Sequence, residues 1–376
     1  MASSVHVGSI PDFYAVVPAG GIGSRLWPVS RADTPKFLHD LTGSGRTLLQ
    51  ATVDRLEPLA GAAGIAVVTG DHHVAAVREQ VPDVTADMVL AEPSPKESMA
   101  AIGLAAAVLQ KRHGDVVIGS FAADQIITGT RAFEQAVHES VAVARAGYIA
   151  TIGIAASRPS TAFGYIRSNG HLGVEGAPNA LHAVAFTEKP DAATAQSYLA
   201  TGEYRWNAGI FVSRTGVLLD HLAEQCPELA AGLDRIAQVW DTAEKDSVLA
   251  ETWPGLQKIA IDHAVAEPVA EAGGVAVVPG TFGWDDVGDF NSLAGLLSAV
   301  GETGDKVVGN EEQVVRMDTG GNVVFPSGKR LITLLGVNDL VVVDTPGALM
   351  VTTRSRAQQV KNLVERLGKD GHTEVL

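Results

Sequence analysis

Residues 14–28 of the chain read YAVVPAGGIGSRLWP, and residues 30–37 continue as SRADTPKF. The apolar run at the start of this stretch predicts a buried strand. The glycines that follow allow the backbone to turn sharply and to approach a ligand closely, and successive N–H groups in such a loop can bind an anion. Three basic residues come soon after the loop: Arg25, Arg31 and Lys36. The stretch therefore predicts a site that holds several phosphate groups side by side.

Two common phosphate-binding loops do not match this stretch. The P-loop requires Gly-Lys-Ser/Thr after its glycines, and that tripeptide does not follow here. The dinucleotide-binding pattern requires a third glycine that opens a helix, whereas Gly23 is followed by Leu26 and Pro28 interrupts a helix. On local features alone, a glycine-rich surface turn with solvated cations remains the alternative.

The composition limits the class of protein. The 376 residues are 46% hydrophobic and 19% charged, which suits two or three domains with a sizeable core. The net charge of −15 argues against a nucleic-acid partner, because such binding depends on clustered Lys and Arg. The single cysteine, Cys226, excludes a disulfide framework and fits a reducing compartment. With no secretory signal pattern and no apolar run of ~18 residues, we expect a cytoplasmic protein with no membrane partner.

Predicted strands and helices alternate from residue 14 to about residue 154. This repetition predicts an α/β fold, with a Rossmann-like, mostly parallel sheet and helices on both faces. Ligands of such sheets bind at the carboxyl ends of the strands. The glycine loop, Glu92 and Asp124 each follow a predicted strand, so we expect them along one edge of the sheet.

Capping patterns predict where two helices begin. Residues 47–50 (TLLQ) and 94–97 (SPKE) each place a Ser or Thr three positions before a Gln or Glu, as in a capping box. Pro58 predicts the end of the first of these helices, because proline disrupts a helix interior.

Beyond about residue 300 the pattern changes to short strands. Between residues 314 and 352 they are separated by Gly, Asn, Asp and Pro turns, and an amphipathic helix follows at 356–367. We therefore divide the chain into residues 1–300, a larger α/β domain, and residues 301–376, a small C-terminal β domain. The short strands suggest coils, and we expect a short left-handed β-helix.

The stretch around the glycine loop resembles the signature of the sugar-phosphate nucleotidylyltransferases, G-G-x-G-x-R-L-x-P followed by P-K. Its L-W-P-x-S-R form, at residues 26–31, is similar to the mannose-1-phosphate guanylyltransferase branch. The resemblance implies a nucleotide-diphospho-sugar transferase fold for the α/β domain. It also implies the activity: an oxygen of α-D-mannose 1-phosphate attacks the α-phosphorus of GTP with Mg²⁺, giving GDP-mannose and pyrophosphate.

The resemblance also implies the roles of individual residues. Arg25, Lys36, Asp124 and Asp286 would be catalytic, and Asp124 and Asp286 would bind Mg²⁺. The nucleotide site would consist of Ala19, Gly20, Gly21, Gly23, Ser24, Arg25, Lys36, Glu92, Ser98 and Asp124. Glu92 would take part in the choice of base.

The sugar-phosphate site would lie on four further segments that resemble family motifs. They read FGYI at 163–166, EKP at 188–190, WNAGIF at 206–211 and GWDDVG at 283–288. The implied binding residues are Gly164, Glu188, Lys189, Asn207 and Asp286. A fifth segment, IDHAV at 261–265, we interpret as structural support.

The chain departs from the guanylyltransferase pattern after Glu92 and near Asp124. Lys96, Glu97, Ser98 and Gln125 replace the family's usual Arg, Asn, Thr and His. Another hexose 1-phosphate, another nucleoside triphosphate or a nucleotide-sugar-dependent glycosyltransferase therefore remain alternatives. Because related enzymes pair through a C-terminal β domain, we also expect a homodimer.

Overall fold

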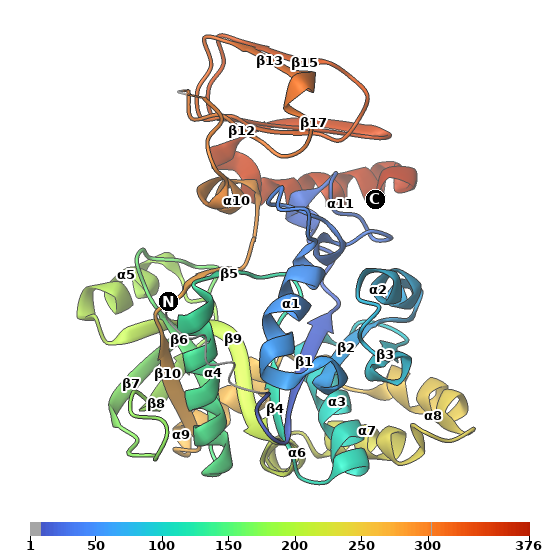
Figure 1. Cartoon of the computed structure of the whole chain (residues 1–376), viewed down its shortest axis with the longest axis vertical. Helices are drawn as coiled ribbons and strands as arrows, with labels where there is room; N and C mark the ends of the chain where they lie inside the picture. Colours follow the sequence, from blue (N-terminus) through green and yellow to red (C-terminus); the bar gives the residue numbers. More distant parts are fainter. Residues whose placement is uncertain (1–8, 302) are drawn as a thin grey trace, which may run out of the picture. The chain divides into compact units, whose positions relative to one another are not determined.

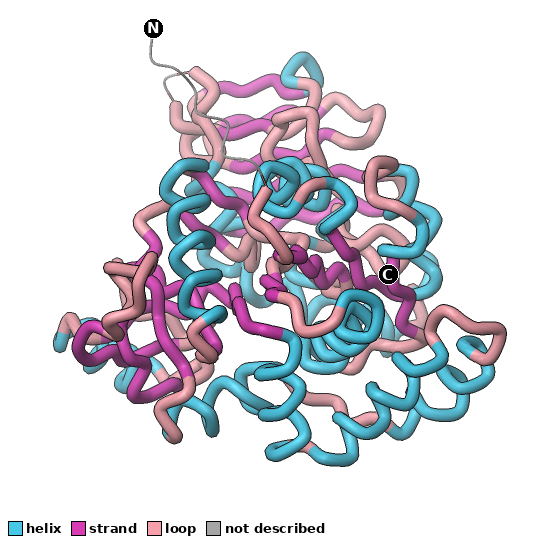
Figure 2. The backbone as a smooth tube through the Cα atoms, turned by 60° about the horizontal axis from the view of Figure 1, so that its bottom comes forward, coloured by secondary structure: helices cyan, strands magenta, loops and turns pink. Residues whose placement is uncertain are grey.

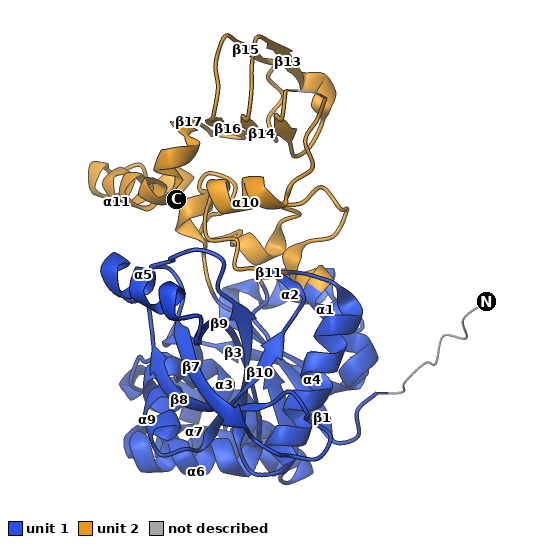
Figure 3. Ribbon diagram, turned by 90° about the vertical axis from the view of Figure 1, so that its left-hand side faces the viewer, with its two compact units in different colours: residues 1–20, 52–123, 127–284 blue, residues 21–51, 124–126, 285–376 orange. Residues whose placement is uncertain are grey.

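The computed structural model describes residues 9–301 and 303–376, along which helices and strands alternate (Figure 1, Figure 2). The chain forms two compact units (Figure 3). Unit 1 contains the chain through Gly20 and residues 52–123 and 127–284, and unit 2 contains residues 21–51, 124–126 and 285–376. The division falls within the glycine loop, because Gly20 belongs to unit 1 and the rest of the loop belongs to unit 2. The boundary predicted near residue 300 falls within unit 2.

Unit 1 is built on a nine-stranded sheet in the order β3-β2-β1-β4-β9-β6-β10-β8-β7. Neighbours among β3, β2, β1 and β4 are parallel, and so are β6 and β10, whereas β9 runs antiparallel between β4 and β6. The strands are β1 (Phe13–Ala19), β2 (Ile65–Gly70), β3 (Val89–Glu92), β4 (Val117–Ser120), β6 (Ile149–Ala155), β7 (Tyr165–His171), β8 (Leu181–Thr187), β9 (Tyr204–Arg214) and β10 (Val275–Gly280). The α/β prediction is confirmed, and the sheet is mixed rather than parallel throughout.

Helices lie on both faces of this sheet (Figure 1). They are α1 (Leu48–Ala60), α2 (Val74–Gln80), α3 (Glu97–His113), α4 (Thr130–Arg145), α5 (Ala192–Thr201), α6 (Thr215–Gln225), α7 (Pro227–Val239), α8 (Lys245–Thr252) and α9 (Glu267–Glu271). Because both faces are covered, the central strands are apolar almost throughout, as in the fully buried β4. No helix among the described residues is long and apolar enough to cross a membrane.

The parallel strands end at one edge of the sheet. β1 pairs with β2 and with β4, so that Val16 lies opposite both Ala66 and Ser120. β3 joins the same parallel set and ends at Glu92. The predicted placement of Gly20 and Glu92 at a common edge is therefore confirmed.

One capping prediction is confirmed and two related predictions are wrong. Thr47 N–H donates to Gln50 Oε1 at 3.1 Å, and Gln50 N–H donates to Thr47 Oγ1 at 3.2 Å, as a capping box requires. Helix α1 nevertheless continues past Pro58, which lies in its last turn, and Gly61 N–H still reaches Glu57 O at 2.8 Å.

The capping box predicted for residues 94–97 does not form. Helix α3 begins at Glu97 itself, with φ +65°, and no side chain caps it. Tertiary bonds hold this segment instead, because Trp253 Nε1 donates to Ser94 O at 2.8 Å and Ile259 N–H donates to Lys96 O at 3.3 Å.

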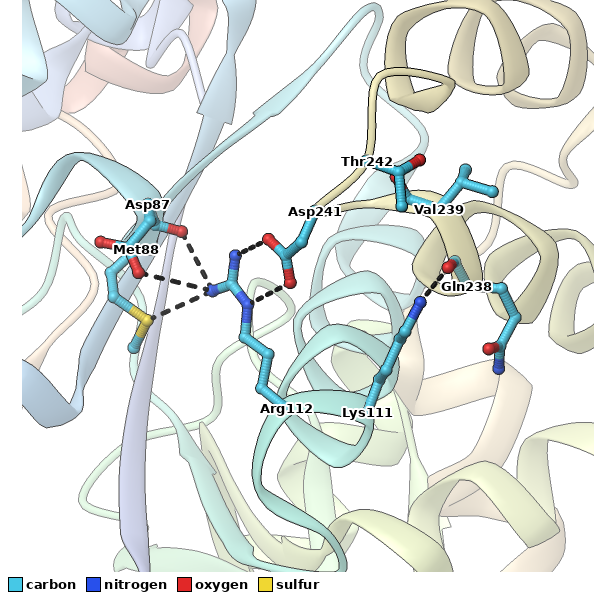
Figure 4. Close-up of polar contacts among 8 residues, drawn as sticks. All are labelled: Asp87, Met88, Lys111, Arg112, Gln238, Val239, Asp241 and Thr242. Atoms are coloured by element: carbon cyan, nitrogen blue, oxygen red, sulfur yellow. Dashed lines mark hydrogen bonds and ion pairs between the residues drawn. The ribbon is translucent and has the colours of Figure 1, made fainter.

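The far end of α3 is held by a forked ion pair (Figure 4). The Arg112 guanidinium donates to both carboxylate oxygens of Asp241, at 2.9 and 2.5 Å, and to the main-chain oxygen of Asp87 at 3.1 Å. Lys111 donates to Gln238 O nearby. These bonds fix α3 against the end of α7, against the segment that follows it and against the residues that precede β3.

Unit 2 contains parallel β coils, which confirms the predicted C-terminal β domain. β12, β14 and β16 stack in parallel in one sheet, β13 and β15 in another, and β17 closes antiparallel on β16. The strands are β12 (Lys306–Val307), β13 (Val314–Met317), β14 (Val323–Pro326), β15 (Ile332–Leu335), β16 (Leu340–Thr345) and β17 (Ala348–Thr353), and the helices are α10 (Phe290–Leu296) and α11 (Val360–Asp370). The left-handed sense of the coils stays a prediction.

The signature stretch packs against this β domain within unit 2. Leu26 and Trp27 are buried in one apolar cluster with Phe290, Phe325 and Val360. Trp27 Nε1 also donates to Val375 O at 2.7 Å. The glycine loop is thus supported by residues from the last part of the chain.

Candidate active site

The glycine loop and Lys36 fit together closely in unit 2. Lys36 N–H donates to Ile22 O at 3.1 Å, and the Ser30 hydroxyl also donates to Ile22 O. Gly23 has φ +78°, and a methyl group on it would lie 2.9 Å from carbons of the Lys36 side chain. Only glycine fits here, since both the backbone angle and the packed lysine exclude a side chain.

The Lys36 ammonium joins both predicted metal-binding aspartates. Its Nζ lies 2.9 Å from Asp124 Oδ2 and donates to the main-chain oxygen of Asp286 at 2.8 Å. The side chains of Lys36 and Asp124 are only 11% and 22% exposed. A methyl group on Gly21 would lie 3.5 Å from the same Asp124 oxygen. The structure therefore brings the glycine loop, a cation and two carboxylates together within one unit.

The Asp286 carboxyl lies among an excess of negative charge. Burial, together with the neighbouring charges of Asp285 and Asp124, raises its pKa to about 6, although the charge of Lys36 acts to lower it. A hard divalent cation would relieve this repulsion, and Mg²⁺ commonly binds one or two carboxylates together with phosphate oxygens. Among the described residues there is no group of three or more His, Cys, Asp or Glu side chains that could hold a metal. Asp124 and Asp286 are the two carboxylates at the glycine loop that could hold such a cation.

The two arginines of the stretch differ in surroundings. Arg25 is exposed, and it has no hydrogen-bond or ion-pair partner among residues 9–301 and 303–376. Arg31 instead donates to Thr345 Oγ1 at 3.1 Å and to Pro346 O at 3.0 Å. Arg25 is therefore available to a ligand, whereas Arg31 ties the stretch to the β domain.

Glu92, at the end of β3, is a buried carboxyl beside a glycine backbone in unit 1. Its side chain is 5% exposed, and a methyl group on Gly20 would lie 3.4 Å from Glu92 Oε1. Its Oε2 is buried without a hydrogen-bond partner in the described part of the chain. Burial raises the pKa of this carboxyl to about 7. This oxygen is available to accept a hydrogen bond from a ligand or from water.

The loop after Glu92 is tied to a distant segment of unit 1. Lys96 Nζ donates to Pro254 O and Leu256 O at 2.7 and 2.8 Å. The Ser98 hydroxyl accepts from Ile261 N–H at 2.9 Å, which leaves its own O–H free to donate. Lys96 and Ser98, two of the residues that depart from the family pattern, thus connect this loop to residues 254–261.

A second polar site in unit 1 surrounds Gly164. A methyl group on Gly164 would lie 2.5 Å from Glu188 Oε2 and 3.3 Å from Asn207 Cβ, so a side chain here would displace the Glu188 carboxylate. Lys189 Nζ pairs with Glu188 Oε1 at 2.5 Å. The predicted sugar-phosphate residues Gly164, Glu188, Lys189 and Asn207 therefore lie together.

Asp262 belongs to the same polar site, although the sequence analysis treats its segment as structural support. Asn207 Nδ2 donates to Asp262 Oδ1 at 2.9 Å. Burial and, to a lesser extent, the charge of Glu188 together raise the pKa of Asp262 to about 6. The signal in the sequence was the resemblance of IDHAV at 261–265 to a family element, and that resemblance did not indicate a contact with Asn207.

Two family models match the chain. Residues 14–302 match a model described as nucleotidyl transferase. Residues 312–367 match a model described as MannoseP isomerase/GMP-like beta-helix domain. Together they cover the two kinds of architecture seen in the fold.

Individual proteins are similar over nearly the full chain. A mannose-1-phosphate guanylyltransferase from Escherichia coli (strain K12) is 35% identical over 370 residues, which are 96% of this chain and 74% of that protein. The xanthan biosynthesis protein XanB from Xanthomonas campestris pv. campestris (strain B100) is 34% identical over 370 residues, 96% of this chain and 75% of that protein. A solved structure from Thermus thermophilus, described as mannose-1-phosphate geranyltransferase, is 30% identical with a TM-score of 0.82 and covers 95% of this chain and 99% of that one.

Proposed function

Since the chain belongs to the nucleotidyl transferase family, we propose that it is an enzyme that transfers GMP from GTP to α-D-mannose 1-phosphate, giving GDP-mannose and pyrophosphate. The observation that carries the proposal is the contact of Lys36 with Asp124 and with the main chain of Asp286 beside the glycine loop. A cation and two carboxylates at a bare backbone loop suit the phosphate groups of a nucleoside triphosphate and a metal. The relative from Escherichia coli and the solved structure from Thermus thermophilus are both named for mannose 1-phosphate, which supports the choice of sugar.

In the proposed reaction, a phosphate oxygen of the sugar phosphate attacks the α-phosphorus of GTP. A new P–O bond forms, the bond to the β-phosphate oxygen breaks, and pyrophosphate leaves with the electron pair. The nucleophile is already an anion, so no general base is required. The protein's task is to hold two anions in line, and positioning of this kind can supply about 7–11 kcal/mol of the barrier.

The nucleotide is bound by the loop from Ala19 to Arg25 and by Lys36. The backbone N–H groups of Gly20, Gly21, Gly23 and Ser24 face phosphate oxygens, Arg25 offers a planar fork, and Lys36 a point charge. Glu92 accepts N–H groups of the base, and Ser98 donates its free O–H. Mg²⁺, held by Asp124 and Asp286, would offset the charge that develops on the phosphates.

The sugar phosphate is bound by Gly164, Glu188, Lys189 and Asn207, with Asp286. Glu188 accepts hydroxyl groups of the hexose, and Lys189 pairs with its phosphate. We extend the proposal to a homodimer and to a cytoplasmic location, which suits a chain with the single cysteine Cys226. We also retain residues 1–300 as the catalytic domain and 301–376 as the C-terminal domain.

The proposal is tested by pyrophosphate release from a matrix of substrates. GTP, ATP, UTP and dTTP are each combined with mannose, glucose and galactose 1-phosphate in the presence of Mg²⁺. We expect GTP with mannose 1-phosphate to have the highest kcat/KM, by about tenfold or more, which corresponds to ~1.4 kcal/mol. A higher kcat/KM for any other pair would overturn the assignment of substrates, and no pyrophosphate release from any pair would overturn the activity.

Replacing Glu92 by glutamine should weaken the use of GTP. An ionised carboxyl accepts two N–H groups, whereas the amide offers one acceptor, and a hydrogen bond to a charged group contributes about 1.5–3 kcal/mol. We expect kcat/KM for GTP to fall by about 10–100-fold. Because the pKa of Glu92 is about 7, the KM of the wild type for GTP should rise as the pH falls through 7, and the variant should lose this dependence.

The matched control is Glu97→Gln, a more exposed glutamate at the start of α3 whose Oε1 lies 3.7 Å from Lys258 Nζ. It should change kcat/KM for GTP by less than about twofold, as is usual for exposed ion pairs. Equal effects of the two substitutions would remove Glu92 from base recognition.

A further inference from the structure

A chain of buried hydrogen bonds runs through the polar site around Gly164. The Thr151 hydroxyl on β6 donates to Asn207 Oδ1 on β9 at 3.0 Å, and Gly209 N–H donates to the same oxygen at 3.0 Å. Asn207 Nδ2 donates to Asp262 Oδ1 at 2.9 Å. Thr151 is fully buried and Asn207 is 7% exposed. These partners, from three separate segments, leave the amide little freedom.

The chemistry of these partners defines how the Asn207 amide is oriented. Gly209 N–H can only donate, so it must face the amide oxygen, and a carboxylate can only accept, so Asp262 must face the amide nitrogen. The two lone pairs of Oδ1 are then occupied by Thr151 and Gly209. One N–H of Asn207 is used by Asp262, and the second is left for a ligand. Asn207 can therefore donate to a ligand but has no acceptor to offer.

The neighbouring groups complete the site. Asn207 N–H donates to Gly164 O at 2.8 Å, and Glu188 Oε2 lies close to Gly164. The site thus combines one amide donor with a carboxylate acceptor and the Lys189 ammonium. This is the set that a phosphorylated polyol requires, since its hydroxyl groups both donate and accept.

We infer that Asp262 is a positioning residue for the hexose 1-phosphate, acting by holding the Asn207 amide so that its free N–H donates to an oxygen of that substrate. The inference rests on the proposed function for the identity of the substrate. Asp262 touches no reacting atom and works through Asn207. The main chain next to Asp262 is also fixed, because the adjacent Ile261 N–H donates to Ser98 Oγ.

The cost of keeping Asp262 in this place supports a role beyond packing. Burial and the charge of Glu188 both raise its pKa, so the ionised form is disfavoured where it lies. An apolar residue would avoid that cost. The Asp262 carboxylate nevertheless holds the Asn207 amide so that its nitrogen, and not its oxygen, faces Asp262.

The inference is tested with Asp262→Ala, Asp262→Asn and Thr151→Val, using KM values and calorimetric titration with mannose 1-phosphate. We expect Asp262→Ala to raise KM and Kd for the sugar phosphate about tenfold or more, with KM for GTP changed by less than about threefold. Asp262→Asn keeps an oxygen that accepts from Asn207 and should recover most of the affinity. Thr151→Val, which frees one lone pair of Asn207, should raise KM for the sugar phosphate about threefold.

Equal rises in KM for both substrates in Asp262→Ala, or an Asp262→Asn variant as weak as the alanine variant, would overturn the inference. Should Asp262→Ala fail to fold, an unchanged sugar-phosphate KM in Thr151→Val would overturn it as well. The comparison uses whichever hexose 1-phosphate the wild type turns over best. If the wild type prefers a different hexose 1-phosphate, the proposed function is contradicted. The role of Asp262 is then tested by the same KM comparison with that substrate.

Discussion

Replacing Lys36 by alanine should lower kcat by about 10²–10³-fold, the usual cost of removing one preorganised group that stabilises developing charge. In the structure Lys36 is the cation that touches both Asp124 and the main chain of Asp286. Without it, the triphosphate loses a positive charge, and the two carboxylates lose the group that offsets their repulsion. We expect saturating GTP not to restore the rate, because the charge is needed in the transition state. The measurement is kcat from pyrophosphate release, with thermal unfolding recorded in parallel.

Two further variants separate charge from geometry. Lys36→Arg keeps the charge but should recover little activity. The Lys36 side chain packs so closely against Gly23 that a methyl group there would lie only 2.9 Å from its carbons, and a larger side chain at position 36 does not fit the same space. Lys361→Ala removes an exposed lysine of unit 2, 3.9 Å from Glu365, and should leave kcat unchanged within about twofold. A Lys36→Ala enzyme within threefold of the wild type would exclude Lys36 from the site.

The sequence was sufficient for those features whose cause is local. The apolar run before the glycine loop predicted β1, and the alternation of strands and helices predicted the parallel direction in which it pairs with β2 and β4. The requirement for glycine at position 23 was visible in the motif, and the structure adds its cause, which is a left-handed backbone packed against Lys36. The capping box at Thr47 depends on two residues three positions apart, and it was predicted correctly.

Features that depend on distant parts of the chain could not be predicted in this way. The start of α3 is set by bonds from Trp253 and Ile259, more than 150 residues away, and these override the local capping pattern. The link between Asn207 and Asp262 spans 55 positions, and no periodicity relates them. The support of Trp27 by Val375 is the extreme case, with a separation of 348 positions.

Asp124 and Asp286 illustrate both what the sequence could predict and what it could not. Their identity as candidates came from motifs, and their association with Lys36 is evident only in the structure. The consequence for Asp286 is a raised pKa, which depends on burial and on the charges of Lys36, Asp285 and Asp124 together. That electrostatic balance leads to a prediction about both activity and stability.

Replacing Asp286 by asparagine should lower kcat about 10³-fold and weaken the response to Mg²⁺, because a neutral amide is a poor substitute for an anionic ligand of a hard cation. The wild type should itself lose apparent affinity for Mg²⁺ as the pH falls through about 6, since protons and metal compete for the Asp286 carboxylate. In the variant this part of the pH dependence should disappear. The measurement is a Mg²⁺ titration of pyrophosphate release between pH 5 and 8, with Asp285→Asn as the neighbouring control. An unchanged titration in Asp286→Asn would show that Asp286 is not a metal ligand.

The same substitution should make the metal-free protein more stable at neutral pH. The pKa of Asp286 in the folded state is raised from 3.8 to about 6, so the folded protein binds this proton more tightly than the unfolded chain does. Ionisation therefore costs stability, beginning near pH 4 and reaching its full extent above pH 6. Removing the charge should increase the free energy of unfolding at pH 7 by on the order of 1–3 kcal/mol, measured by urea unfolding with EDTA, and the gain should vanish near pH 4. Greater stability together with lost activity would show that the buried carboxylate is maintained for its ligand, whereas a less stable variant at pH 7 would contradict the electrostatic account.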